Sequence, residues 1–497
     1  MTPASRFELG GRSLREHAAR GTVINALFMI GLSSLALVKG FLVAVFLDRS
    51  DYGVWGIVVV CMTTLLWLRD VGIGDKFIQQ DDEDQELAFQ KAFTLELLVA
   101  LLSMVVLAAF LPLFAVIYGE WEIVAPGLVV LLILPAAALS TPLWVYYRQM
   151  RFLRQRIVQA VDPIVAFVVT VALAATGAGY WSFIIGFLVG AWAMALVAMV
   201  NAPVRLRLRR EALEGETLRS YASFSWPLVV GGAAGLVLVQ ATTLATDVHL
   251  GIAAVGVVAL ASNVTQFANR VQDLVTDTLY PAICAVRDRT DVLRESFLKS
   301  NRLGMMWGMP FGVGLTLFYA DLVDFGIGAE WETSVTLVQA FGLVVAMSQI
   351  YFNWGAYFRA LGNTRPLAVA PWAAAITLLV VGLPLLFAYD LDGLAAGIFL
   401  QTVAHLAVRI YYLHRLFEEL PLVRHALSGV LPVIPGALVV LGMRALETGA
   451  RSLPEAVAEL LVFVAVTAAA TWWKEAPLLR EAFGYLAGSR VRAASTS

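Results

Sequence analysis

The segment GIAAVGVVALASNVTQFANRVQDLVTDTLYP, residues 251–281, is apolar enough for a lipid bilayer and yet carries a regular series of polar side chains. The series, with members three or four residues apart, is Asn263, Gln266, Arg270, Asp273 and Asp277. At 100° per residue these side chains fall on one side of a helix, within an arc of about 80°. A charge at the membrane centre costs about 2.5–3.5 kcal/mol on insertion scales, so the stripe is expected to avoid lipid. The segment predicts either a wall of an aqueous cavity in a helical bundle or a polar seam between helices.

The composition of the whole chain agrees with a membrane environment. Of its 497 residues 60% are hydrophobic and 14% are charged, and the mean hydropathy is +0.78, far from the average for soluble domains. The net charge of −2 lacks the basic excess of a nucleic-acid-binding protein. The two cysteines, Cys61 and Cys284, are too few for a disulfide framework or a metal site. We therefore expect an all-α, multi-pass membrane protein without a metal, a cofactor or a nucleic-acid partner.

Apolar runs of about 20 residues, the length that crosses a bilayer, predict fourteen transmembrane helices. They are expected at 22–47, 52–71, 92–117, 122–144, 157–176, 180–201, 222–244, 251–280, 303–323, 333–357, 366–388, 391–413, 426–445 and 453–473. With this division the loops on one side hold only Arg49, Arg444 and Arg451, while nearly all other lysines and arginines lie on the opposite side. Because cytoplasmic loops are the basic ones, both termini are predicted to be cytoplasmic.

An internal repeat divides the chain into two similar halves. DYGVWGIVV (51–59) resembles AVGVVAL (254–260), and GEWE (119–122) resembles AEWE (329–332), at offsets of 203 and 210 residues. Tandem halves of the same orientation are related by an axis along the membrane normal. The sequence thus predicts two six-helix lobes with a pseudo-twofold axis, followed by two further helices. The predicted division is a cytoplasmic segment 1–21, an N-lobe 22–201, a basic linker 202–221, a C-lobe 222–413, two helices within 426–473 and a cytoplasmic tail 474–497.

Several motifs in this order resemble a known family. They are the DYGVW turn, DVGIGDKFIQQ (70–80), YYRQMRF (146–152), GAGYWSF (177–183) and GAEW (328–331). Over about residues 20–415 the chain is similar to Wzx-type polysaccharide exporters of the multidrug/oligosaccharidyl-lipid/polysaccharide (MOP) superfamily, in the fourteen-helix subgroup. The resemblance implies two lobes around a V-shaped cavity in the cytoplasmic (inner) membrane. It also implies flipping of undecaprenyl-pyrophosphate-linked oligosaccharide, with polysaccharide polymerase or chain-length proteins as partners.

Such a substrate presents a pyrophosphate, many hydroxyls and a polyprenyl tail, so its carrier needs cations and hydrogen-bonding groups in the cavity. Arg270 and Lys39 are the candidate cations; the alternatives are a local pair between Arg270 and Asp273 and snorkelling of Lys39 to the interface. The predicted substrate-contacting residues are Lys39, Asn263, Gln266, Arg270, Asp273, Gln349, Asn353, Gln401 and His405. The amides of this set equally suit hydrogen bonds between helices.

Three acidic residues are candidates for ion coupling, namely Glu96, Asp162 and Asp277. Asp162 precedes Pro163, so capping of a helix that starts there is the alternative for this residue.

The predicted function is transport rather than catalysis, because the sequence has no P-loop, HExxH or GxSxG motif. A drug or cation antiporter of the same superfamily is one alternative, although such a carrier is expected to have acids where the first helix has Lys39. A lipid II flippase is a second alternative, which only a substrate measurement separates. A membrane-embedded polysaccharide polymerase or ligase is a third, but the predicted outer loops are too short for its catalytic site.

Overall fold

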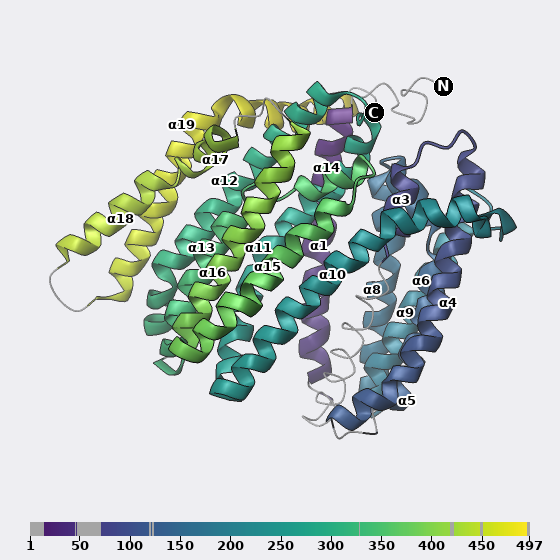
Figure 1. Ribbon diagram of the computed structural model, residues 1–497, viewed down its shortest axis with the longest axis horizontal. Helices are drawn as coiled ribbons and strands as arrows, with labels where there is room; N and C mark the ends of the chain where they lie inside the picture. Colours follow the sequence, from purple (N-terminus) through teal and green to yellow (C-terminus); the bar gives the residue numbers. More distant parts are fainter. Residues whose placement is uncertain are drawn as a thin grey trace. The chain divides into compact units, whose positions relative to one another are not determined.

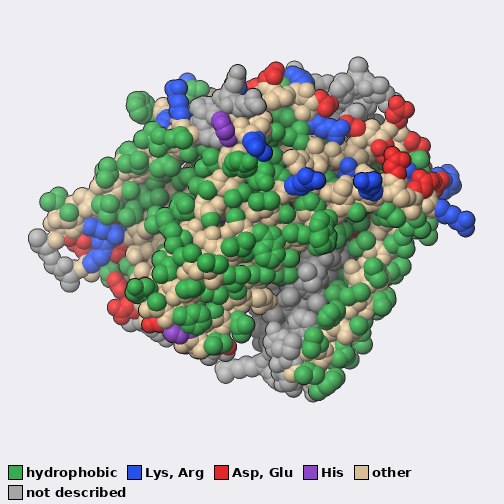
Figure 2. Space-filling model, viewed as in Figure 1, with side chains coloured by type: hydrophobic (Ala, Val, Ile, Leu, Met, Phe, Trp, Pro, Cys, Tyr) green, Lys and Arg blue, Asp and Glu red, His purple; other side chains and the backbone are tan. Residues whose placement is uncertain are grey.

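The computed structural model (Figure 1) describes residues 14–44, 46, 71–118, 121, 124–327, 329–417, 422–447 and 451–494. These residues form helices joined by turns, and no strand occurs among them. Seven helices in this part of the chain are long and apolar enough to cross a membrane, or nine if each of two bent helix pairs is one span. Hydrophobic side chains cover much of the visible helix surfaces (Figure 2), as expected where lipid replaces water. The predicted all-α multi-pass membrane fold is confirmed.

The chain folds into two compact units, Met1–Val229 and Val230–Ser497, here called the N-terminal and C-terminal units. The boundary falls inside α10 (Gly215–Leu250), so this helix begins in one unit and ends in the other. The division into lobes and linker stays a prediction.

The N-terminal unit consists of helices that pack mainly against α8 and α9. Before α10 it contains α1 (Leu14–Ala44), α3 (Ile73–Gln79), α4 (Gln85–Tyr118), α5 (Val124–Leu131), α6 (Ile133–Leu139), α7 (Pro142–Arg148), α8 (Phe152–Ala175), α9 (Trp181–Val200) and η3 (Arg210–Leu213). Gly186 and Gly190 of α9, one turn apart, lie against α8, where a Cβ at Gly186 would collide with Thr170. Small residues on a shared face allow two helix backbones to approach closely, which explains the tight α8–α9 pair.

The C-terminal unit is built around α12, α13 and α16. After α10 it contains α11 (Ile252–Ala285), α12 (Thr290–Leu322), η4 (Val323–Ile327), η5 (Ala329–Ser334), α13 (Val335–Ser348), α14 (Trp354–Ala360), α15 (Arg365–Thr377), η6 (Leu378–Gly382), α16 (Leu383–Leu416), α17 (Leu422–Val430), α18 (Ile434–Leu446) and α19 (Leu453–Ala494). Its core includes Tyr319, Phe341, Leu386 and Leu394, all buried. Figure 1 shows α18 and α19 side by side, and α19 also packs on α12.

The predicted helices agree with the described ones in most places. The turn predicted between helices ending at 388 and starting at 391 is present, because α16 has non-helical backbone at Tyr389 and Asp390. Asp390 has φ 54° and ψ −137°, a conformation that glycine adopts most easily. The predicted helix 52–71 lies outside the described residues.

Three predicted helices are broken, which corrects their prediction as continuous spans. The helix predicted at 122–144 bends by 48° before α7, where Pro142 lacks the N–H that would continue the backbone ladder. The helix predicted at 333–357 stops at Ser348 and resumes at Trp354, with Tyr351 at a φ of 60° between them. The helix predicted at 426–445 bends by 46° between α17 and α18.

One helix in each unit ends with the same backbone motif, at positions that nearly correspond in the sequence repeat. After α7, Met150 has a φ of 55° and the N–H of Arg151 donates to the Tyr146 carbonyl at 2.8 Å. After α14, Gly362 has a φ of 72° and the N–H of Asn363 donates to the Phe358 carbonyl at 3.0 Å. Both are left-handed helix caps of the Schellman type. Met150 and Gly362 are 212 residues apart, two more than the offset of the EWE motifs.

Candidate functional site

In the N-terminal unit a lysine on α1 and an acid on α8 interact electrostatically. Lys39 and Asp162 are both half-buried, and the carboxylate attracts the ammonium group electrostatically. Asp162 lies inside α8, which starts at Phe152, so the alternative of capping a helix start is wrong. Its carboxylate occupies the space left by Gly190, since a Cβ there would lie 2.5 Å from Asp162 Oδ1. The close packing of α9 against α8 therefore restricts the position of the Asp162 carboxylate.

A hydrogen bond joins the same two helices. Arg156 of α8 donates from Nε to the Oδ1 atom of the buried Asn25 on α1 at 2.7 Å, and from Nη1 to Gln159 at 3.0 Å. Sequence reasoning did not single out Asn25, although an asparagine inside an apolar run is a signal for such a bond. Glu96, another of the predicted coupling acids, is half-buried on α4.

The polar stripe between Asn263 and Asp277 lies on α11, whose backbone is helical as predicted. The side chains of three stripe residues lie outside what the structure describes, namely Asn263, Gln266 and Arg270. Asp273 and Asp277 are exposed, and Asp273 is attracted by Arg359 of α14. The Arg359 guanidinium lies over the Tyr280 ring at 5.1 Å from its centroid. A cation from another helix thus attracts Asp273 electrostatically, an interaction that sequence spacing alone does not indicate.

Gln349 and Asn353 lie at the break between α13 and α14, and both are buried. Asn353 donates to Ser300 Oγ at 2.6 Å, and the Gln349 carbonyl accepts from Asn301 at 3.3 Å. The Gln349 side chain packs against Gly308 of α12, and no hydrogen bond to its amide occurs among the described residues. Asn353 therefore makes the hydrogen bond between helices that was the alternative for these amides.

The same network extends to a histidine that sequence reasoning missed. His425 of α17 is buried, and its Nε2 atom lies 2.8 Å from Asn301 Oδ1. Its ring also stacks on Tyr351, with centroids 6.0 Å apart. The network thus ties the first C-terminal helix to α12 and to the α13–α14 break.

Gln401 and His405 are half-buried on α16, one turn apart as predicted. One turn further, Arg409 donates from Nη1 to the Ser348 carbonyl at 3.3 Å and lies over the Trp354 ring at 5.9 Å. Carbonyls at a helix C-terminus lack partners within the helix, so Arg409 satisfies the end of α13. Over the described ranges no three His, Cys, Asp or Glu side chains converge to hold a metal.

Comparison with known proteins places this architecture. Residues 42–336, more than half of the chain, match the family described as polysaccharide biosynthesis protein. The chain belongs to this family. No curated protein matches it in sequence.

Solved structures give the fold of this polysaccharide biosynthesis protein. A mutant of a MATE transporter superposes with a TM-score of 0.69 at 12% identity, covering 82% of this chain and 98% of that one. A MOP superfamily transporter from Pyrococcus furiosus, whose binding pocket is reported to have reverse polarity, gives 0.67 at 12% identity, with coverages of 82% and 98%. An outward-facing multidrug MATE transporter gives 0.64 at 13% identity, again covering 82% and 98%. At such identities the likeness shows the fold, and the fold expected from the resemblance to the MOP superfamily is confirmed.

The family match ends before α17–α19, and these C-terminal helices are held to α12 by a charged cluster. Glu459 of α19 accepts from Arg444 Nε at 3.0 Å and from Arg451 Nη2 at 2.6 Å. Asp321 of α12 accepts from the same two arginines at 3.0 Å each. The bonds to Asp321 and then to Glu459 raise the pKa of Arg451, so its guanidinium is charged at any accessible pH. The sequence indicated Arg444 and Arg451 only as outer-side cations.

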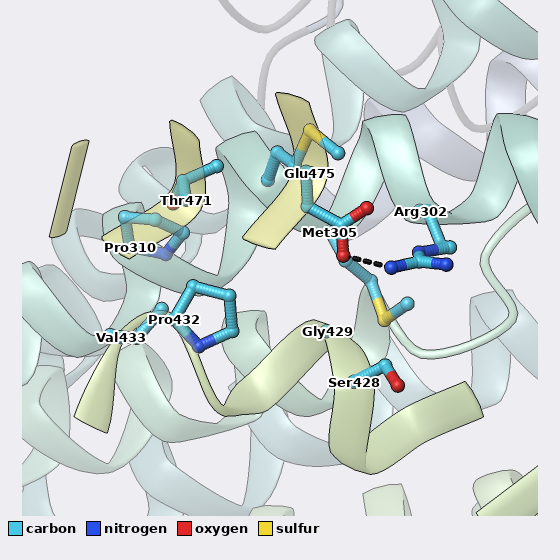
Figure 3. Close-up of a pocket in the computed structure, with 10 residues that line it drawn as sticks. Arg302, Met305, Pro310, Ser428, Gly429, Pro432, Val433, Thr471 and Glu475 are labelled. Carbon is cyan, nitrogen blue, oxygen red and sulfur yellow. Dashed lines mark hydrogen bonds and ion pairs between the residues drawn. The ribbon is translucent and has the colours of Figure 1, made fainter. Parts of the chain in front are cut away.

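A small pocket lies at the other end of this helix contact (Figure 3). Arg302 of α12 and Glu475 of α19 form an ion pair at one side, while Met305, Pro432 and Val433 supply apolar walls. Arg302 is already paired with Glu475, so its positive charge is neutralised within the protein. The pocket is therefore poorly suited to bind an anion. None of the predicted site residues lines it.

Proposed function

We propose that the chain carries polyprenyl-pyrophosphate-linked oligosaccharide across the cytoplasmic membrane by alternating access between two lobes, with both termini cytoplasmic. The observation that supports this most is the family match, because polysaccharide made outside the cell needs its lipid-linked units moved from the side where they are assembled. The MOP fold supplies a framework of two compact halves for that movement. Proteins that polymerise the units or set chain length are the proposed partners.

The N-terminal unit contributes a cation suited to the pyrophosphate. A half-buried ammonium group in an apolar helix is stabilised by a nearby anion, and Asp162 is the acid that attracts Lys39. A pyrophosphate arriving near α1 competes with Asp162 for Lys39. Asp162 is then left without its cation, which favours neutralisation by a proton, so substrate binding and proton uptake are linked at one pair.

The C-terminal unit contributes groups for the sugars. Asp273 with Arg359, and Gln401 with His405, present carboxylate, amide and imidazole atoms that bind hydroxyls. Arg270 is the second proposed cation, by its position on α11 in the stripe that includes Asp273. Gln349 and Asn353 remain weaker candidates, because they are buried at the helix break.

The test compares charge variants for export of polysaccharide and for lipid-linked precursor left on the inner leaflet, at equal membrane abundance of the protein. Lys39→Ala should abolish export and accumulate precursor, and Lys39→Arg should retain part of the activity. Lys91→Ala, which removes a half-exposed lysine of α4, is the matched control and should leave export unchanged.

Two results would contradict the proposal. If Lys39→Ala with Asp162→Ala restores export, Lys39 only neutralises Asp162 and has no part in substrate binding. If deletion of the protein leaves polysaccharide precursor levels unchanged but alters drug resistance or accumulates lipid II, the antiporter or lipid II alternative is correct.

A further inference from the structure

Residues 201–214 run from the end of α9 through η3, and the extended part before η3 is fixed to α4. Gln90 donates from Nε2 to the Arg205 carbonyl at 3.1 Å and accepts from Arg209 Nε at 2.6 Å. The N–H of Arg209 donates to Thr94 Oγ1 at 3.0 Å. Gln90 and Thr94 are both buried. The course of the segment is therefore set by two buried polar side chains rather than left to solvent.

Three arginines of this segment are exposed and have no protein partner in the described chain. The side chains of Arg205, Arg207 and Arg210 make no ion pair or hydrogen bond with another described residue. Glu211 and Glu214 follow in the same turn, yet neither comes within ion-pair distance of these arginines. Arg209, in contrast, is used to hold the segment on Gln90. The three exposed guanidinium groups are thus available to an anion outside the protein.

Exposed apolar side chains stand among these arginines. Leu208 is 66% exposed, Leu213 is 54% exposed, and Val200 at the end of α9 is 85% exposed. The segment connects two candidate membrane spans, one ending at Val200 and the other starting at Gly215. Its residues therefore lie at the level where the hydrocarbon layer meets the head groups. At that depth arginine meets phosphate and leucine meets the acyl chains.

We propose that this basic strip, defined as Arg205, Arg207, Arg210, Leu208 and Leu213, binds the head groups of anionic phospholipids in the adjoining leaflet. The combination selects a lipid, because a soluble anion engages the guanidinium groups but gains nothing from exposed leucines. A neutral phospholipid meets the leucines without the net attraction of the three positive charges. The inference is independent of the transported substrate.

The test uses the full-length protein in nanodiscs with a photoreactive phosphatidylglycerol or phosphatidylcholine, and maps labelled peptides by mass spectrometry. Unlabelled phosphatidylglycerol is then added as a competitor, and its effect on labelling of the peptides from residues 201–214 gives the affinity of this segment for the lipid. A basic residue near an anionic surface contributes about a 5-fold change in binding, so Arg205→Gln, Arg207→Gln and Arg210→Gln together should weaken it about 100-fold. Arg289→Gln, another exposed arginine on the predicted cytoplasmic side, is the control and should leave labelling of the segment unchanged.

A second variant tests the apolar part of the strip. Leu208→Ser with Leu213→Ser should weaken labelling by phosphatidylglycerol while competition by inorganic phosphate stays as weak as in the unaltered protein. The proposal is wrong if phosphatidylcholine labels the segment as strongly as phosphatidylglycerol, or if the arginine variant labels normally. Displacement of the lipid by inorganic phosphate alone would identify a free-phosphate site instead, and protection of the segment only by an added soluble protein would identify a protein interface.

Discussion

Glu459 is the residue whose removal should destabilise the C-terminal helices most. Its carboxylate is fully buried and lies between Arg444 and Arg451, which are 27% and 22% exposed. Taking one partner from a buried ion pair costs about 3–5 kcal/mol. Here Asp321 remains bound to both arginines and water reaches them in part, so we expect Glu459→Ala to lower the free energy of unfolding by about 2–3 kcal/mol.

Glu447→Ala is the matched control, because Glu447 accepts from the same Arg451 at 2.9 Å but its side chain is 30% exposed. An ion pair with that exposure contributes about 0–1 kcal/mol. Both free energies can be measured on the full-length protein in bicelles by steric trapping, with labels placed on α12 and α19. Equal losses for the two variants would refute the reasoning, since burial of the acid would then have no influence. A loss for Glu459→Ala that persists after Arg444 and Arg451 are also removed would show that the effect does not come from charge.

The remaining predictions concern packing, backbone strain and topology. Gly190→Ala should lower the free energy of unfolding by about 1–3 kcal/mol, because the added Cβ collides with α8. Gly31→Ala is the control and should not lower it, because a Cβ there meets nothing within 4 Å. Thermal unfolding measures both variants. Asp390→Gly should be about 1 kcal/mol more stable than Asp390→Ala, because both lose the contact with His249 but only glycine relieves the backbone; chemical unfolding compares them, and an equal stability would contradict the strain. Reporter fusions after Arg210 should report cytoplasm and those after Gly179 periplasm, and one reversed site would disprove the predicted orientation.

Helix positions were predictable because membrane spans are a property of local composition. A run of about 20 apolar residues must be helical in lipid, whatever its neighbours. The breaks were harder to predict. Pro142 is a visible signal, but the stretch from Gln349 to Asn353 contains no proline, and its break depends on bonds to residues of α12.

Partners across helices were beyond the reach of sequence spacing. The spacing of three residues on α11 suggested Arg270 as the partner of Asp273, a pair that lies outside the described side chains. The same spacing gave no sign of Arg359 on α14, which attracts this acid electrostatically. Asp162 looked like a helix cap because Pro163 follows it, and the length of α8 shows otherwise. Spacing reports which side chains share a helix face, while pairing depends on which helices become neighbours.

The charged cluster at the end of α12 also has a consequence for the order of biosynthesis. Asp321 enters the membrane with α12, whereas Arg444 and Arg451 are synthesised more than a hundred residues later. At ordinary elongation rates of 5–20 residues per second, this interval lasts about 6–25 s. During that time the acid has neither arginine partner and must stay hydrated at the interface. The C-terminal half therefore completes its assembly only after α19 has been inserted, and a nascent chain stalled before Arg444 presents an uncompensated carboxylate that membrane quality control can recognise.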